Sequence, residues 1–182
     1  MDRRIHIVGR KNSGKTTLIV ELVSRLTTLG YRVGTIKHTH HDHEFDTPGK
    51  DSFRHGEAGA AVVGIVGPRL TAVFESTDGF GPETDRYEAI ETMFDQCDLV
   101  LVEGDLQTGS PKIEVWRAAG HSLPLSATHD SIQAVVTDDP CRATVPIFPR
   151  EDIADLVNWI SEIVAGPRAR NRIPAAGFQD FI

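Results

Sequence analysis

The segment that most restricts the fold of this chain is the octapeptide GRKNSGKT at residues 9–16. It matches the pattern G-x-x-x-x-G-K-[ST] at every fixed position. The apolar segment IHIV precedes it at residues 5–8, and apolar residues at helical spacing follow it between residues 15 and 29. In this context the two glycines let the loop curl with its backbone amides inward, beside the positive end of the following helix. The motif therefore predicts a phosphate-binding loop between a strand and a helix.

The residues of this loop have separate predicted roles. Lys15 supplies a positive charge for the outer phosphates of a nucleotide, and the Thr16 hydroxyl can ligate Mg²⁺. Thr17 can contact the innermost phosphate. The predicted nucleotide-binding residues of the loop are Gly9, Arg10, Lys11, Asn12, Ser13, Gly14, Lys15, Thr16 and Thr17. The Lys11 side chain either adds charge to the site or points to water, and the sequence favours neither.

Strand-like and helix-like segments alternate along the rest of the chain. Strands are expected at residues 5–8, 31–37, 60–67, 70–76, 98–104, 112–117 and 133–138. Helices are expected at residues 15–29, 82–97 and 150–166, and a short one is expected to begin near Thr47 and Pro48. This alternation favours an α/β fold. We predict a three-layer P-loop NTPase fold with a mostly parallel central sheet flanked by helices.

Length and composition are those of an ordinary soluble domain. The 182 residues are 40% hydrophobic and 25% charged, with a net charge of −7, which argues against a nucleic-acid carrier. We predict a nucleotide-binding domain at residues 1–165 and a loosely ordered tail at residues 166–182. No apolar run approaches the roughly 20 residues of a membrane span. Two cysteines far apart in the sequence, Cys97 and Cys141, fit a reducing compartment, so the expected location is the cytoplasm.

A metal-bound nucleotide needs a second acid, which the segment DLVLVEG at residues 98–104 can supply. Ligands of α/β sheets lie beyond the carboxyl ends of the strands. Asp98 begins this strand and would lie roughly 16 Å from its other end, at about 3.3 Å per residue. Glu103 ends the strand, so it is the predicted metal ligand, directly or through water, and a predicted catalytic residue together with Lys15. Asp105 is a weaker alternative.

The segment KHTHHDHEFDTPGKDS, residues 37–52, is polar and holds four of the eight histidines within six residues. Long connections in compact domains are usually functional. Three interpretations stay open: a transition-metal site, because imidazole suits zinc and nickel, a mobile phosphate-sensing loop near the nucleotide, or a solvated loop. Lys37 and His38 are predicted nucleotide contacts. Asp51 is a predicted ligand of Mg²⁺, because carboxylate oxygens suit that ion.

Four segments together point to a known family: GRKNSGKTTL, IKHTHHDHEFDTPGKDSFRHGEAGA, DLVLVEG and PKIEVWR. Over about residues 4–165 the chain resembles MobB, the family of molybdopterin-guanine dinucleotide biosynthesis adaptor proteins. The second segment is far more specific than the first, which occurs in nucleotide binders of many kinds. The resemblance implies a homodimer that binds GTP with Mg²⁺ and hydrolyses it slowly. It also implies two kinds of partner: the nucleotidyltransferase that attaches GMP to molybdopterin, and other proteins that handle the molybdenum cofactor.

The sequence departs from the pattern of that family after the VEG tripeptide. The family typically continues with Phe and Lys, whereas this chain continues with DLQTGS, so Lys112 is considered as a substitute for the missing basic residue. The N-K-x-D guanine signature is also absent. The segment VVTDD at residues 135–139 follows a late strand, where a carboxylate could accept hydrogen bonds from the guanine N1–H and exocyclic amine. Asp138 is the predicted guanine contact, and a plain turn acid before Pro140 is the alternative.

Three functions remain open on the sequence. The first is a slow GTPase that serves as an adaptor in molybdenum cofactor maturation. The sequence shows no obvious arginine finger and no clear water-positioning Gln, the parts that accelerate hydrolysis, although Arg10 or a residue of a second subunit could serve. The second is an ATP-dependent kinase or ligase for a small molecule, with the histidine-rich segment as its lid. The third is a GTPase that delivers nickel or zinc through its histidines.

Overall fold

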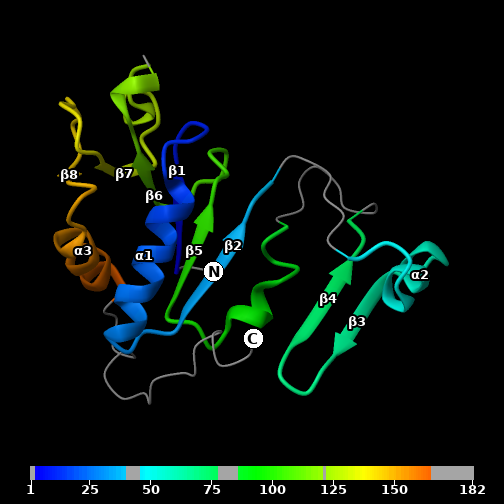
Figure 1. Ribbon diagram of the computed structural model, residues 1–182. Coiled ribbons are helices and arrows are strands. Elements are labelled where there is room, and N and C mark those ends of the chain that lie inside the picture. The colour runs from blue at the N-terminus through cyan, green and yellow to red at the C-terminus, as the bar shows by residue number, and fades with distance from the viewer. Residues whose placement is uncertain (1–2, 40–45, 78–85, 121, 165–182) are drawn as a thin grey trace. The chain divides into compact units, whose positions relative to one another are not determined.

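The structure, a computed structural model, describes most of the chain (Figure 1). The described residues are 3–39, 46–77, 86–120 and 122–164. They fall into two compact units, residues 3–39 with 90–164 and residues 46–77 with 86–89. The domain at residues 1–165 stays a prediction, and the predicted tail lies outside the described residues. Among the helices of the described stretches, none is long and apolar enough to cross a membrane.

The first unit is built on a six-stranded sheet in the order β2-β5-β1-β6-β7-β8, in which every neighbouring pair is parallel. Its strands are β1 (Arg4–Val8), β2 (Val33–Lys37), β5 (Leu99–Glu103), β6 (Lys112–Val115), β7 (Ile132–Val136) and β8 (Ile147–Phe148). The predicted α/β fold with a mostly parallel sheet is confirmed. The two-residue strand β8 is not among the expected strands, because so short a segment has no recognisable alternation. β1 lies between β5 and β6, so the loop after β1 has a strand end on either side.

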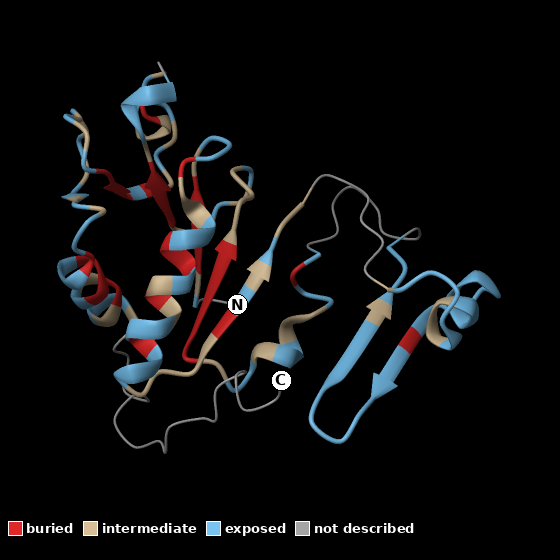
Figure 2. Ribbon diagram, viewed as in Figure 1, coloured by how far each residue is buried: buried red, intermediate tan, exposed pale blue. Residues whose placement is uncertain are grey.

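Helices α1 (Lys15–Thr28) and α3 (Ala154–Val164) pack on one face of this sheet (Figure 1). Leu18 and Leu22 of α1 are 0% exposed, and they join Ile160 of α3 in one core cluster. The strand side chains in this cluster are Ile5, Ile7, Leu99, Leu101, Ile113, Val115, Ala134 and Val136. Figure 2 shows β5 and the other central strands largely as buried, whereas the edge strand β2 is mostly intermediate or exposed. The expected helix at residues 15–29 is confirmed to within one residue.

In the described residues, connections and short 3-10 helices cover the opposite face of the sheet. The expected helix at residues 82–97 is wrong over its described part, where η1 (Glu91–Phe94) is a single 3-10 turn. The Phe94 ring lies directly on Gly34 of β2, 2.5 Å from the position that a Cβ of Gly34 would take. A continuous helix is replaced because the segment must turn to set Phe94 on this glycine. Two further 3-10 turns follow β6, η2 (Ala118–Gly120) and η3 (Leu125–Ala127).

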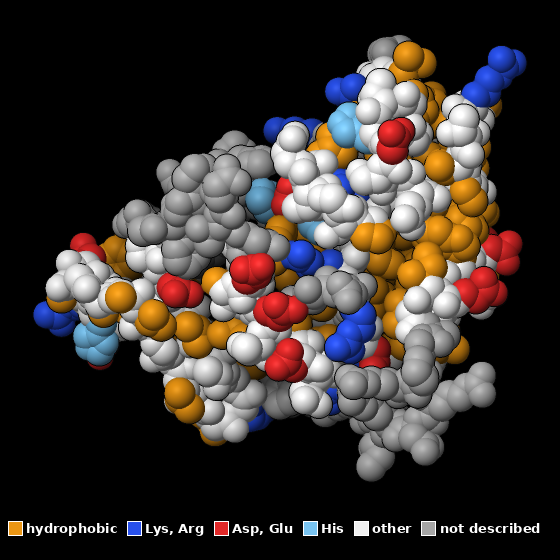
Figure 3. Space-filling model, turned by 180° about the vertical axis from the view of Figure 1, so that it is seen from behind, with side chains coloured by type: hydrophobic (Ala, Val, Ile, Leu, Met, Phe, Trp, Pro, Cys, Tyr) orange, Lys and Arg blue, Asp and Glu red, His pale blue; other side chains and the backbone are white. Residues whose placement is uncertain are grey.

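The second unit contains α2 (Asp51–Glu57) and an antiparallel hairpin of β3 (Val62–Val66) and β4 (Thr71–Glu75). The two expected strands are confirmed, and the Gly67 amide closes the turn by donating to the Leu70 carbonyl. The short helix begins at Asp51 rather than near Pro48, because residues 47–50 form a turn closed from the Lys50 amide to the Thr47 carbonyl. The hairpin is mostly exposed, and hydrophobic side chains of this unit reach the surface (Figures 2 and 3).

Candidate functional site

The loop at residues 9–17 joins the end of β1 to the first turn of α1, and its two motif glycines are required by the backbone. Gly9 has φ +145°, and a Cβ there would overlap the Val115 carbonyl oxygen and lie 2.7 Å from Ser13 Oγ. Gly14 has φ +102° and caps the N-terminus of α1. Side chains are disfavoured at such positive φ. The glycines therefore fix a curled loop at the carboxyl end of β1, where α/β sheets bind ligands.

Lys15 is the first residue of α1 and folds back over this loop. Its Nζ donates hydrogen bonds to the carbonyl oxygens of Gly9 (3.0 Å) and Arg10 (2.9 Å). Both acceptors are neutral carbonyl groups, so neither of these bonds pairs Lys15 with a negative charge. The helix N-terminus beside it adds a partial positive charge. The Lys15 ammonium and the helix N-terminus therefore make this end of the sheet suitable for the outer phosphates of a nucleotide. Contact between Lys15 and those phosphates stays a prediction.

Thr16 and Glu103 lie together, as the sequence predicts. The Thr16 hydroxyl donates to Glu103 Oε1 at 2.9 Å, because β5 lies beside β1 with Glu103 in register with Ile7. Asp98, at the other end of β5, is 8% exposed and accepts a hydrogen bond from the Arg32 amide. Asp98 is therefore a structural acid.

The donor set of Thr16 and Glu103 fits Mg²⁺. That ion binds through one or two protein oxygens and takes its remaining ligands from phosphates and water. The third predicted metal ligand, Asp51, is the first residue of α2 in the second unit, so its role at this site stays a prediction.

Lys37 is the last residue of β2 and lies next to Glu103, and His38 follows it. Lys37 is paired with Glu103 in the parallel register, and the His38 amide donates to the Glu103 carbonyl oxygen at 3.0 Å. The His38 ring is turned toward Asp105, with 3.5 Å between Nδ1 and Oδ2. Their predicted contacts with nucleotide stay predictions. The other three histidines of this segment lie outside the described residues, and within the described stretches no group of three or more His, Cys, Asp or Glu could hold a metal.

Lys112 does not replace the missing basic residue of the family pattern. It begins β6 and is 0% exposed, and its ammonium donates to the carbonyl oxygens of Thr108 and Ser110. These carbonyls belong to the connection at residues 104–111, which starts directly after Glu103 and must pass β1 to reach β6. His6 of β1 lies under the same connection, with Nδ1 3.1 Å from the Gly104 carbonyl oxygen. Lys112 therefore anchors the segment behind Glu103.

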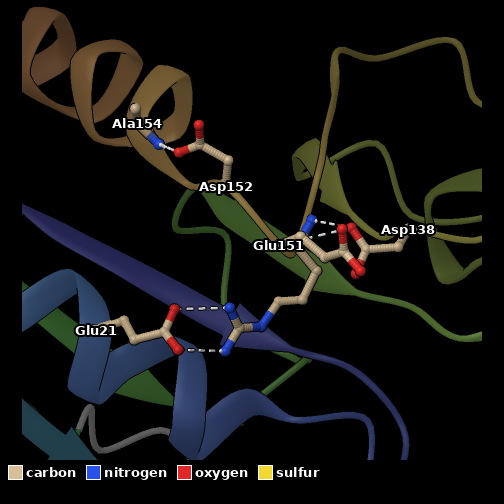
Figure 4. A network of polar contacts seen from close by, with 6 residues as sticks. Glu21, Asp138, Glu151, Asp152 and Ala154 are labelled. Atoms are coloured by element: carbon tan, nitrogen blue, oxygen red, sulfur yellow. Dashed lines mark hydrogen bonds and ion pairs between the residues drawn. The ribbon is translucent and has the colours of Figure 1, made fainter.

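The predicted guanine contact, Asp138, lies at the end of β7 and links two loops (Figure 4). Its Oδ1 accepts hydrogen bonds from the amides of Arg150 (2.6 Å) and Glu151 (3.0 Å), just after β8. The Arg150 guanidinium in turn makes two hydrogen bonds to the Glu21 carboxylate of α1. One Asp138 oxygen is thus engaged by backbone, as expected of a turn acid. A guanine contact through this carboxylate stays a prediction.

Sequence reasoning missed Arg117, which lies against the 9–17 loop. Its Nε donates to the Ser13 carbonyl oxygen at 3.1 Å, and its Nη2 is 3.6 Å from the position that a Cβ of Gly14 would take. Arg117 is the second residue after β6, at the same edge of the sheet as the loop. The only signal for this position is the strand order, which places β6 next to β1 and cannot be deduced from the pattern of one chain.

Residues 4–138 match the family described as "Molybdopterin guanine dinucleotide synthesis protein B", abbreviated MobB. This match covers more than half of the chain. The chain belongs to the MobB family. The membership inferred from the four sequence segments is thereby confirmed.

Two MobB relatives are similar over most of their length. The "Molybdopterin-guanine dinucleotide biosynthesis adapter protein" of Escherichia coli (strain K12) is 33% identical over 151 residues, which are 82% of this chain and 86% of the relative. The protein of the same name from Haemophilus influenzae is 36% identical over 160 residues, or 85% and 87% of the two chains.

Solved MobB structures share the fold. The crystal structure of Bacillus subtilis MobB superimposes with a TM-score of 0.69 at 26% identity, over 90% of this chain and 99% of that one. The MobB homologue from Bacillus stearothermophilus gives a TM-score of 0.64 at 26% identity, over 90% and 98%. The predicted P-loop NTPase fold is confirmed by these MobB neighbours together with the parallel sheet.

Proposed function

We propose that this chain is a GTP-binding adaptor with slow GTPase activity in molybdopterin-guanine dinucleotide biosynthesis. The observation that carries the proposal is the hydrogen bond of 2.9 Å between Thr16 Oγ1 and Glu103 Oε1, at the foot of a glycine loop that also holds the Lys15 ammonium. P-loop NTPases use this combination of hydroxyl, acid and ammonium for a magnesium-bound nucleoside triphosphate. The biosynthetic step comes from the names of the MobB relatives, which are called adapter proteins.

In this proposal each group has one task. The loop amides and Lys15 bind the outer phosphates, while Thr16 and Glu103 hold Mg²⁺. The ion supplies neutralisation of the charge on the phosphate oxygens. Thr17 is assigned to the innermost phosphate, and the partners are the guanylyltransferase of the pathway and other cofactor-maturation proteins.

Calorimetric titration of the full chain with GTP, GDP and ATP, with and without Mg²⁺, tests this proposal. GTP should bind more tightly than ATP, and Lys15→Ala should remove most of the affinity while the thermal unfolding curve stays that of the wild type. Arg25→Ala is the matched control, since it removes one positive charge from an exposed position further along α1. A clear preference for ATP would favour the kinase or ligase alternative. A folded protein that binds none of the three nucleotides would overturn the proposal.

We also propose that the chain forms a homodimer, as the family resemblance implies. The β3–β4 hairpin supports this, because Val62, Ile65 and Val66 are 53%, 41% and 84% exposed, and an isolated two-stranded sheet is at best marginally stable. Sedimentation velocity should give a dimer for the wild type and a monomer for the double variant Ile65→Asp, Val66→Asp. Val20→Asp, at an exposed valine of α1, should leave the dimer intact. A wild-type monomer would contradict the proposal.

A further inference from the structure

Arg117 is held beside the 9–17 loop by two separate anchors. Its Nε donates to the Ser13 carbonyl oxygen at 3.1 Å. The next residue is fixed as well, because the Ala118 amide donates to Asp139 Oδ2 at 2.8 Å, at the end of β7. The Arg117 side chain and the backbone that follows it are therefore held by residues of other elements, the 9–17 loop and the end of β7.

The rest of the guanidinium has no protein partner among the described residues. Nη1 and Nη2 make no hydrogen bond or ion pair there, while Nη2 lies 3.6 Å from the Cβ position of Gly14, the residue that caps α1. A guanidinium carries five donors in a planar fork. Four of these donors, on Nη1 and Nη2, are not used by the bond to Ser13, and Nη2 lies beside Gly14 of the loop. Such a fork matches a pair of phosphate oxygens, whereas an ammonium offers only a point charge.

The strand order places Arg117 on the side of the loop away from the metal ligand. Glu103 reaches the loop from β5, on one side of β1, and Arg117 reaches it from β6, on the other side. If the outer phosphates lie with Lys15, Thr16 and Glu103 and the phosphate chain extends away from Glu103, the inner phosphates lie on the β6 side of the loop. The fork of Arg117 then meets the inner end of the phosphate chain.

We propose that Arg117 is a nucleotide-binding residue that contacts the inner phosphates, which GDP and GTP share. This inference rests on the proposed nucleotide binding. It differs from an arginine finger, which acts on the transferred phosphate. Arg117→Ala should weaken GDP and GTP by the same factor, about 10- to 100-fold, which is the usual range for a hydrogen bond to a charged group. Glu103→Gln should weaken GTP in the presence of Mg²⁺ more than it weakens GDP.

Arg117→Gln separates phosphate binding from support of the loop. The glutamine amide can still donate to the Ser13 carbonyl oxygen, but it lacks the charge. If Arg117 binds phosphate, the glutamine variant resembles the alanine variant, and the logarithm of the GDP affinity falls less steeply with the logarithm of salt concentration than in the wild type. If Arg117 only supports the loop, the glutamine variant binds GDP as the wild type does, and the inference is overturned.

Arg142→Ala, which removes an exposed arginine, is the control for the loss of one charge and should change the GDP affinity less than twofold. If the wild type binds GDP and GTP and Arg117→Ala binds them with the same affinity, the inference is overturned and the proposed function still stands. A wild-type protein that binds neither nucleotide would instead remove the proposed function, and this inference with it.

Discussion

Both faces of the six-stranded sheet carry buried side chains, but the chemistry of these side chains differs between the faces. The face under α1 and α3 is apolar from β5 to β7. The other face carries His6, Lys112 and Glu114, which are 0%, 0% and 1% exposed. Adjacent residues of β6 show the contrast most directly, since Ile113 points to the helices and Lys112 to the connections.

The difference follows from what covers each face. A helix satisfies its own backbone, so the side chains facing it can all be apolar. A connection without a helix brings unpaired carbonyls and amides onto the sheet, and buried backbone groups need partners. Lys112 supplies donors to the carbonyls of residues 104–111, and the Glu114 carboxylate accepts from the amides of Leu125 and Ser126. The buried charges therefore replace the hydrogen bonds that a covering helix would have made internally.

Ile113→Ala tests the apolar face and should have the largest effect. It deletes three buried carbons from the centre of the core cluster, and a truncation of this kind costs about 2–5 kcal/mol of the free energy of unfolding. Urea denaturation followed by circular dichroism measures the loss. Ile147→Ala in β8, where the side chain is 42% exposed, is the control and should lose much less. Equal losses at the two positions would show that the apolar face is not a close-packed core.

Lys112→Met tests the polar face. Methionine keeps the unbranched side chain up to the position of Cε but removes Nζ, which leaves the Thr108 and Ser110 carbonyls without their donor and costs about 1–3 kcal/mol. Hydrogen exchange should show the loss concentrated in residues 104–111, while α1 keeps its protection. A variant more stable than the wild type would mean that burying this ammonium costs more than its hydrogen bonds return.

The sequence predicts the nucleotide loop and Glu103 because both depend on local rules. Glycines at fixed spacing mark the loop, and a strand that ends in an acid puts Glu103 at the ligand edge. The roles of Lys112 and Arg117 depend on strand order. Lys112 holds the connection that passes over β1, and Arg117 reaches the 9–17 loop because β6 lies beside β1. The sequence of one chain does not reveal which strands are neighbours. The predicted helix at residues 82–97 is wrong for a related reason. Phe94 packs on Gly34 of β2, which lies about sixty residues earlier in the chain.

His6→Gln should change how stability depends on pH. Burial is the main cause that lowers the pKa of His6 from 6.5, and Lys112 and Arg4 lower it further, while the Gly104 carbonyl and Asp105 oppose them. The unfolded chain therefore binds more protons than the folded one below pH 6.5, so stability falls as the pH drops from there toward the folded pKa. One proton limits this slope to about 1.4 kcal/mol per pH unit.

Urea denaturation of wild type and His6→Gln at several pH values, between about 5 and 8, measures this difference. The variant should lose the part of the slope that His6 contributes. Identical slopes would show that His6 is not kept neutral by its surroundings, and the contrast between the two faces would then rest on Lys112 and Glu114 alone.

Glu21→Gln should have the smallest effect, because its ion pair lies at the surface rather than under a connection. The Arg150 guanidinium donates to both Glu21 oxygens, at 2.7 and 3.0 Å, but the Glu21 side chain is 43% exposed, and exposed pairs contribute about 0–1 kcal/mol. The hydrogen bond from Arg150 lowers the pKa of Glu21 from 4.5, so this contribution is present above pH 4.5 and is lost as the pH falls through the folded pKa. Thermal unfolding at neutral and acidic pH should show a small gap between wild type and variant that closes in acid. A loss as large as that of Lys112→Met would mean that this pair fixes the position of Arg150 and, through it, the Asp138 loop. The exposed Glu21–Arg150 pair would then contribute as much to stability as the Lys112 ammonium buried beneath the β5–β6 connection.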